Sequence, residues 1–355
     1  MRENPKLYIA LALIPQLILI KILSFYPEFI ETYYSNGIYP WTSKLFRWVF
    51  GWLPFSFGDI FYTLSSIYIL RWIFKNRWRI LKDTKNWVIE IFATISILFF
   101  AFHFLWALNY YRQPLHKNLN LNADYTTEQL VEVTKMLIEE SNTLHNALAK
   151  NDSTKIDIPY SKSDIFNLAP EGFKNLQLKY PHLAYEPSSV KYSIYSLALT
   201  YMGFSGYLNP LTNEAQVDRL IPIFKFPTTA SHEIAHQLGY AAENEANFIG
   251  ALAAMNHKDI YFNYSGYTFA LRHCLFEVYK RDSETYYKLL ETVNYGIIKN
   301  YQEVQQFWDS YQNPLEPIFK ETYDSFLIAN NQKKGMQSYN YVVALYVNYF
   351  LSTHS

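Results

Sequence analysis

The segment Pro227-Thr-Thr-Ala-Ser-His-Glu-Ile-Ala-His-Gln-Leu-Gly239 holds two histidines on what its pattern predicts to be one helix. His232 and His236 are four residues apart, and residues at this spacing lie on the same face of a helix. Pro227 and the hydroxyl residues after it favour a helix start, and Gly239 favours a helix end in the left-handed conformation. The segment therefore predicts two imidazoles that reach one ion.

Glu233 follows the first histidine directly. From that position its carboxylate can face a water held by the ion without binding the ion itself. The helical context, with its start and stop signals, makes the His-Glu-x-x-His pattern more specific. The alternative interpretation is a pair of surface histidines beside a solvated glutamate.

A zinc ion that keeps an open position for water needs a third protein ligand. After Gly239, the sequence Glu243-Asn-Glu-Ala-Asn247 begins a second helix-like stretch, Ala242 to Asn256. This stretch is rich in Ala and contains Gly, and small residues allow two helices to approach closely. One of its glutamates, Glu243 or Glu245, is therefore the expected third ligand.

The composition narrows the class of protein. The chain has 355 residues, 50% of them apolar, and a formal net charge of zero. It is long enough for a membrane anchor and one soluble domain with its own core. The neutral balance gives no reason to expect a nucleic acid partner. The single cysteine, Cys274, excludes an intrachain disulfide and a cysteine-based zinc site, so histidines and carboxylates have to hold any metal.

Three long apolar runs precede the histidine segment: Leu7–Tyr26, Ser56–Phe74 and Trp87–Tyr110. Each has about the 20 residues that a membrane-spanning helix needs, and Trp and Tyr stand at the edges, as membrane interfaces favour. We expect residues 1–110 to form a membrane anchor of about three transmembrane helices, and residues 111–355 to form a soluble domain. The alternative is that the runs are buried helices of a soluble core.

Basic residues predict the orientation of this multi-pass anchor. The end of the second run and the segment that follows it carry Arg71, Lys75, Arg77, Arg79, Lys82 and Lys85. The segment between the first and second runs carries only Lys44 and Arg47. Positive loops remain in the cytoplasm. We therefore expect the N-terminus inside and the chain after Asn109 on the extracytoplasmic side. No small-residue cleavage site follows the first run, which favours an uncleaved span over a signal peptide.

Beyond the apolar runs the pattern is that of a mainly α protein with a small β-sheet. Residues Thr126 to Ala149 predict an amphipathic helix, and Thr126 with Gln129 predicts a capping box. The stretch Ser189 to Phe226, with its Gly and Pro punctuation, predicts a few strands joined by turns. From Thr228 to the end the pattern is mostly helical.

The two-helix pattern resembles the gluzincin metallopeptidases. Membrane proteases of that class carry Glu-x-x-x-Asp on the second helix, and its first Glu binds zinc. The matching glutamate is Glu243, whereas Asn247 stands at the Asp position. This departure changes the charge beside the ligands, although Asn can still orient a histidine by hydrogen bonding. The resemblance implies a zincin-like α+β metallopeptidase domain with zinc (Zn²⁺) as cofactor, and Glu245 remains the alternative ligand.

The whole chain is similar to the family called domain of unknown function 3810. The matching stretches are the apolar N-terminus, part of Ser205–Ala215, the histidine segment, and the tail from Tyr323-Asp-Ser-Phe-Leu through Ser338-Tyr339. This resemblance implies a membrane-tethered, metallopeptidase-like domain, and it implies no known substrate.

The mechanism that this pattern predicts is zinc-assisted hydrolysis. His232, His236 and Glu243 would hold the ion, and Glu233 would act as the general base. For a group that stabilises the oxyanion, the sequence offers Tyr264, Tyr267, Arg272 and His273, each of which a packing or surface role also explains. The stretch from Tyr207 to Pro222 offers a strand edge along which an extended peptide could pair.

Three functions fit these residues. The first is an extracytoplasmic zinc peptidase that acts on a peptide or protein and is anchored in the lipid bilayer. The second is a zinc hydrolase of a non-protein envelope substrate, which the motif does not distinguish from the first. The third is a non-catalytic membrane-bound binding or assembly module with a degenerate or structural metal site. A structural zinc is usually closed by four protein ligands, which separates the third function from the others.

Overall fold

The computed structural model describes residues 4–332 and 341–354. Within them the chain is mainly helical and contains one three-stranded sheet. This confirms the mainly α class with a small sheet that the sequence predicts. Of the stretches that carry the family resemblance, Ser338-Tyr339 lies outside the described residues.

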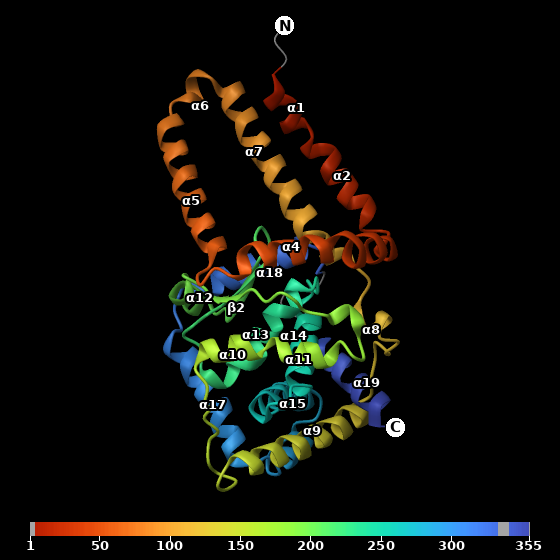
Figure 1. The fold of residues 1–355 in the computed structure, drawn as a ribbon. Coiled ribbons are helices and arrows are strands. Elements are labelled where there is room, and N and C mark those ends of the chain that lie inside the picture. The colour runs from red at the N-terminus through yellow and green to blue at the C-terminus, as the bar shows by residue number, and fades with distance from the viewer. Residues whose placement is uncertain (1–3, 333–340, 355) are drawn as a thin grey trace.

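Three helical arms stand on one side of the molecule, and further helices run across their base (Figure 1). The arms are formed by α1 (Pro5–Leu11) with α2 (Leu13–Leu23), by α5 (Phe57–Asn76), and by α7 (Thr84–Leu105), with α6 (Arg79–Lys82) joining the last two. The base is formed by α3 (Pro27–Phe29), the π-helix η1 (Ile30–Ile38), α4 (Tyr39–Gly51) and the 3₁₀-helix η2 (Ala107–Tyr111).

Among the described residues, two helical stretches are long and apolar enough to cross a membrane: Pro5–Leu23 and Thr84–Leu105. They correspond to the first and third apolar runs of the sequence. The second run also forms a long helix, α5, but α5 carries three charged residues and is not one of the two. Helix α7, which corresponds to the third run, ends at Leu105 and not at Tyr110 as predicted. Trp106 leaves the helical conformation there, and the chain continues as η2.

The body of the molecule lies on the other side of the base (Figure 1). Its helices are α8 (Leu115–Asn118), α9 (Thr127–Leu148), α10 (Lys162–Leu168), α11 (Pro170–Leu176), η3 (Pro181–Leu183), α12 (Ser196–Met202), η4 (Ile223–Lys225), α13 (Phe226–Gln237), α14 (Glu243–Met255), α15 (Ile260–Arg281), α16 (Ser283–Leu290), α17 (Tyr295–Ser310), α18 (Glu316–Ala329) and α19 (Val342–His354). The amphipathic helix and its Thr126–Gln129 capping box are confirmed in α9. The sequence did not predict α12, which interrupts the strand-rich stretch.

The sheet has the order β1-β3-β2, with β1 (Val190–Tyr192), β2 (Gly206–Asn209) and β3 (Glu214–Val217). The central strand β3 is buried along its whole length, runs parallel to β1 and is antiparallel to β2. Strand β2 is therefore an edge strand. Within the residues that the structure describes, no other strand pairs with its outer edge.

Helices α13 and α14 approach one another very closely at Gly250. A Cβ atom added to Gly250 would lie 2.7 Å from the backbone nitrogen of His232 and 2.8 Å from its Cα. Only glycine fits at such a distance, so the two backbones meet where α13 carries its first histidine. The small residues of α14 act here as the sequence predicts, because they allow α14 to reach α13.

Residues from both sides of Tyr110 share one small core beneath the arms. This cluster contains Ile30, Tyr34, Tyr39, Trp106, Ala107, Tyr110, Tyr111, Leu208, Ala241 and Leu327. It joins the base of the arms to β2, to the start of α14 and to α18. The base therefore packs into the body rather than lying on it as a separate layer.

We predict that Gly250→Ala destabilises the protein by about 1–3 kcal/mol, because the added methyl group forces α13 and α14 apart. Thermal unfolding in detergent micelles measures this as a lower Tm. The matched control is Gly37→Ala, whose Cβ would meet only the Thr32 carbonyl oxygen, at 3.2 Å. If both variants unfold at the wild-type temperature, the close approach of the two helices is wrong.

Candidate metal centre

Helix α13 presents His232 and His236 on one face. It begins at Phe226 with Pro227 in its first turn, where a missing N–H costs nothing. The two imidazole rings lie 4.6 Å apart between centroids and are nearly perpendicular. The four-residue spacing therefore brings both rings to one point, as the sequence predicts.

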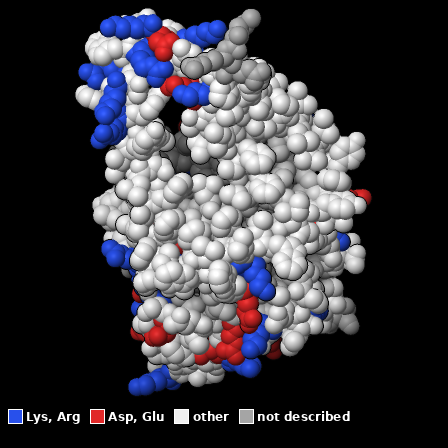
Figure 2. Space-filling model, turned by 45° about the horizontal axis from the view of Figure 1, so that its top comes forward, with Lys and Arg blue, Asp and Glu red and all other residues white. Residues whose placement is uncertain are grey.

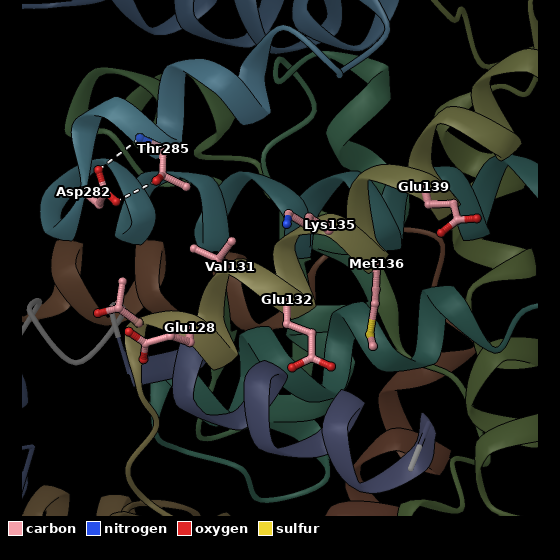
Figure 3. Close-up of a pocket in the computed structure, with 9 residues that line it drawn as sticks. Glu128, Val131, Glu132, Lys135, Met136, Glu139, Asp282 and Thr285 are labelled. Carbon is pink, nitrogen blue, oxygen red and sulfur yellow. Dashed lines mark hydrogen bonds between the residues drawn. The ribbon is translucent and has the colours of Figure 1, made fainter.

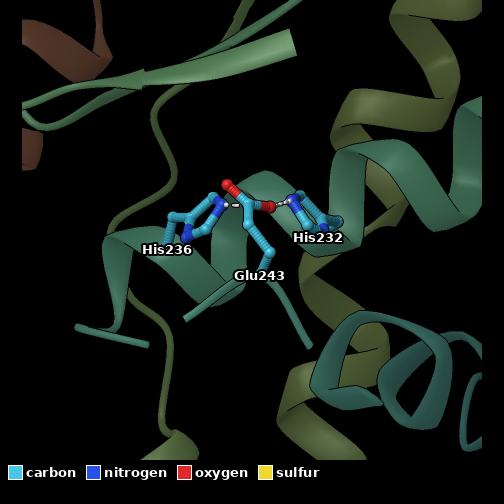
Figure 4. Close-up of side chains that lie close together, drawn as sticks. All are labelled: His232, His236 and Glu243. Carbon is cyan, nitrogen blue, oxygen red and sulfur yellow. Dashed lines mark ion pairs between the residues drawn. The ribbon is translucent and has the colours of Figure 1, made fainter. Parts of the chain in front are cut away.

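Glu243, the first residue of α14, places its carboxylate between the two rings (Figure 4). Its Oε2 lies 3.3 Å from Nε2 of His232 and 3.6 Å from Nε2 of His236. One candidate ligand atom from each residue lies within 4.8 Å of the others. Two atoms that bind one tetrahedral zinc at about 2.0–2.1 Å are about 3.3 Å apart, and the two distances from Glu243 to the imidazole nitrogens approach this value.

The turn between the two helices fixes the orientation of His236. Its Nδ1 donates a hydrogen bond to the Tyr240 carbonyl oxygen at 2.7 Å, which turns Nε2 toward Glu243. Gly239 adopts a positive φ of +89°, which closes this turn and confirms the left-handed end predicted from the sequence. The Nδ1 of His232 makes no hydrogen bond of good geometry within the described residues, although the Asn247 side chain lies near enough to act on this ring.

The three groups share charge in the metal-free protein. Burial lowers the pKa of His236, but the neighbouring Glu243 carboxylate outweighs burial and raises this pKa to about 9. Burial lowers the pKa of His232, while Glu243 and Asn247 oppose that shift. Burial also raises the pKa of Glu243, but the two histidines hold it well below its usual range. An ionised carboxylate is thus ready to face a cation.

Glu233 lies beside this group without belonging to it. Its side chain is buried, and its Oε2 has no hydrogen-bond partner within the described chain. Burial raises the pKa of Glu233 to about 8. A buried polar atom without a partner is costly unless water or a ligand satisfies it. The unpartnered oxygen therefore indicates that a water or a substrate group belongs next to Glu233.

The second candidate ligand, Glu245, serves another purpose. Its Oε1 accepts a hydrogen bond from the backbone N–H of Leu115 at 2.6 Å. The structure therefore brings Glu243, and not Glu245, to the two histidines. Of the two glutamates that the sequence left open, Glu243 is the one whose carboxylate lies beside the histidines, and its role as a metal ligand stays a prediction.

A buried ion pair holds the turn that separates the two helices. Arg112 donates to both carboxylate oxygens of Glu31, at 2.6 and 2.9 Å, and to the Gly239 carbonyl oxygen at 3.0 Å. The Arg112 guanidinium also lies over the Tyr240 ring, 4.2 Å from its centroid. Both residues of the pair are buried. Glu31 comes from η1, so the base of the arms positions the turn that orients His236.

Two aromatic residues at the site were not predicted from the sequence as site residues. Tyr323 of α18 donates a hydrogen bond to Oε1 of Glu243 at 2.5 Å. The Trp106 ring lies edge-on to His236, and its Nε1 donates to the His236 carbonyl oxygen at 3.4 Å. Tyr323 lies in a stretch that carries the family resemblance, and this was the one feature of the sequence that could have pointed to it as a site residue. No spacing rule links it to Glu243 across the intervening chain.

The four residues that the sequence offers for stabilising an oxyanion make their contacts away from the His232–His236–Glu243 group. The Tyr264 hydroxyl is buried and donates to Asn300. Tyr267 packs near Phe350, and His273 packs against Phe269. Arg272 is exposed. Among the described contacts, none joins these residues to the His232–His236–Glu243 group, whereas Tyr323 does reach it.

A surface groove on the body is separate from this site (Figure 3). It is lined by α9 and by the start of α16, and it carries Glu128, Glu132 and Glu139 around Lys135. Asp282 is already used there, since its carboxylate accepts from the N–H and the hydroxyl of Thr285. The groove is thus explained as a solvated acidic face with a helix cap.

Comparison with known proteins gives one match. The family model described as "Protein of unknown function (DUF3810)" matches residues 34–347, which include α4, α5, α7, η2 and most of the body, whereas α3 and the start of η1 lie outside the match. No curated protein matches the chain, and no solved structure matches it. The resemblance to gluzincin metallopeptidases stays a prediction.

We predict that Glu31→Gln destabilises the protein by about 3–5 kcal/mol, because it removes the carboxylate that forms the buried ion pair with Arg112. Chemical or thermal unfolding in detergent measures this change. Glu284→Gln is the matched control, since Glu284 forms an exposed pair with Lys288 at 2.6 Å, and exposed pairs contribute little. Equal stability of the two variants would contradict the role of the buried pair.

We also predict opposite pH dependences for the Tm of the metal-free protein and for the increase in Tm that added zinc causes. The pKa of His236 is raised from 6.5 to about 9, so its stabilising contribution is complete below the lower value and is lost as pH rises through the higher one. The pKa of Glu233 is raised from 4.5 to about 8, which also favours the folded state at low pH. The metal-free Tm should therefore fall between about pH 6 and pH 9.

Added zinc should raise Tm more at the upper end of that range, because zinc binds deprotonated ligands. Differential scanning fluorimetry with and without zinc measures both effects. A metal-free Tm that rises over this range, or a zinc effect that shrinks with pH, would show that these groups are not the ones that titrate.

Proposed function

This chain belongs to the DUF3810 family of proteins of unknown function, and we propose that it is a membrane-anchored zinc hydrolase, of which a peptidase fits best. One observation carries the proposal. Two imidazole nitrogens and one carboxylate oxygen converge within 4.8 Å beside the buried carboxylate of Glu233, whose Oε2 has no partner in the described chain.

In this proposal His232, His236 and Glu243 hold the ion. When bound there, zinc supplies an activated water at neutral pH and polarises the carbonyl to be cleaved. Tyr240 keeps the His236 ring in position through its carbonyl oxygen, and Tyr323 holds the other oxygen of Glu243. These contacts keep a single carboxylate oxygen directed at the two imidazoles.

Glu233 carries the proton in this proposal. It takes a proton from the attacking water and delivers it to the leaving amine. The surroundings suit a group that has to exist in both protonation states, because burial raises its pKa to about 8 in the metal-free protein. Its free Oε2 gives the water a place to bind.

The edge strand β2 supports a polypeptide substrate. Its first residue, Gly206, lies so close to Glu233 that a Cβ would meet Oε1 at 2.6 Å. An extended peptide that pairs with the outer edge of β2 at its half-buried first residues, Gly206 and Tyr207, would thus run past the catalytic carboxylate. Such backbone pairing holds any sequence in an extended form, which favours a peptide over other amide substrates.

The arms support anchoring by several membrane spans, with the body on the extracytoplasmic side. The basic residues of α5, α6 and α7 gather at the tip of the arms, and a broad belt of uncharged atoms separates them from the charged body (Figure 2). At the tip, Lys6 and Arg79 both pair with Glu90, at 2.7 and 2.8 Å. The N-terminal end and the basic loop therefore lie together, which fits a shared cytoplasmic side.

The group contains three residues and, among those described, no fourth His, Cys, Asp or Glu. A structural zinc is usually closed by four protein ligands. The open set supports the hydrolase over a non-catalytic binding or assembly module with a structural metal.

We predict that Glu233→Gln lowers hydrolysis by at least about a hundredfold while the protein retains its zinc, because only the proton carrier is lost. Zinc content by mass spectrometry and hydrolysis of a peptide library measure the two properties. Glu243→Ala should lose zinc as well as activity, whereas Glu245→Gln should retain zinc. Full activity of Glu233→Gln would refute the assigned role, and zinc loss in Glu245→Gln rather than Glu243→Ala would refute the ligand set.

A further inference from the structure

Helix α4 has one face buried in the body and an apolar face that nothing in the described chain covers. Tyr39, Ser43 and Arg47 form the buried face. The opposite face exposes Trp41, Leu45, Trp48 and Trp52 by 77%, 56%, 71% and 76%. This spacing of three and four residues places the four side chains in one stripe along the helix.

The position of α4 relates this stripe to a membrane. The three arms rise from the same side of the base, and α4 runs across their feet (Figure 1). Helix α7 has 22 residues and is therefore about 33 Å long, close to the hydrocarbon thickness of about 30 Å. If the arms cross the bilayer, their feet mark its surface, and α4 lies along that surface.

The composition of the stripe fits the headgroup layer better than water. Tryptophan is enriched where one end of a side chain is apolar and the other is wet, as at a membrane interface. An amphipathic helix with such a face lies flat in the boundary between headgroups and acyl chains. Helices α12 and α18, in the upper part of the body (Figure 1), also expose apolar side chains: Leu197, Tyr201, Ile318 and Phe326.

Helix α4 is hydrogen-bonded to the end of α13, the helix that carries the two histidines of the candidate metal centre. Tyr39 and Ser43, on the buried face of α4, donate hydrogen bonds to the Gln237 carbonyl oxygen at 3.0 and 2.8 Å. Gln237 is the last residue of α13 and follows the ligand His236. The candidate site on α13 is therefore in direct contact with α4, on the side of α4 that faces the body.

We propose that the exposed face of α4 is seated in the headgroup layer of the bilayer and that this holds the site at the membrane surface, where it acts on polypeptides tethered to the same membrane. The substrate part rests on the proposed hydrolase function. Tethering raises the local concentration of a substrate near a surface-held site, so a membrane-bound polypeptide outcompetes a free one.

The first experiment measures the depth of α4 independently of activity. The Leu45→Cys variant carries an environment-sensitive fluorophore in vesicles of phosphatidylethanolamine and phosphatidylglycerol that contain lipids brominated at defined depths. The native Cys274 is fully buried and does not compete for the label. The matched control is labelled Lys288→Cys on α16, where Lys288 is exposed on the body.

We expect quenching of the Leu45 label by bromine near the headgroups, and no quenching of the Lys288 label. A water-like, unquenched Leu45 label overturns the proposal. Emission from the Leu45 label that changes only with protein concentration also overturns it, because the face then binds a second copy of the chain.

The second experiment tests the substrate class with a peptide library in two forms, free and palmitoylated, mixed with the reconstituted protein. We expect the palmitoylated form to be consumed at least about tenfold faster, and we expect Trp48→Glu to reduce this advantage. Equal consumption of both forms overturns the tethered-substrate inference while the hydrolase proposal stands. Consumption of neither form, at the level of Glu233→Gln, rejects the hydrolase function itself.

Discussion

The placement of one buried carboxylate between two imidazoles is the constraint on which the rest of this structure depends. Glu243 can reach His232 and His236 only because α13 and α14 meet backbone to backbone at Gly250. Burying an ionised carboxylate is costly unless opposite charge and hydrogen bonds surround it. The histidines and the Tyr323 hydroxyl provide this compensation in the metal-free protein. A metal ion bound there would take the place of the protonated histidine as the positive charge that compensates the Glu243 carboxylate.

Residues at the base of the arms make hydrogen bonds that position the candidate site. Tyr39 and Trp106 donate hydrogen bonds to the carbonyl oxygens of Gln237 and His236, the last two residues of α13. Arg112 and Glu31 hold the turn that follows. Four residues that precede the body in sequence thus hold the end of α13 and the turn that orients His236. Of these residues, Tyr39, Trp106 and Arg112 lie within the family match, and Glu31 lies just before it.

The histidine helix, its glycine end and the second helix could be predicted from local sequence, because spacing, caps and small residues act over a few positions. The choice between Glu243 and Glu245 could not, since it depends on where α14 begins and on the Leu115 N–H that binds Glu245. Tyr323 and Glu31 were missed for a related reason. Their partners are 80 and 81 residues away, and only the folded chain brings them together. The predicted domain boundary at residue 110 stays a prediction.

X-ray absorption at the zinc edge of the purified full-length protein tests the central claim most directly. The account predicts one zinc ion with two imidazole nitrogens and a carboxylate oxygen at about 2.0–2.2 Å, together with a further oxygen from water. A protein without zinc after zinc-supplemented purification would contradict the account. So would a zinc ion with sulfur ligands or with four protein ligands.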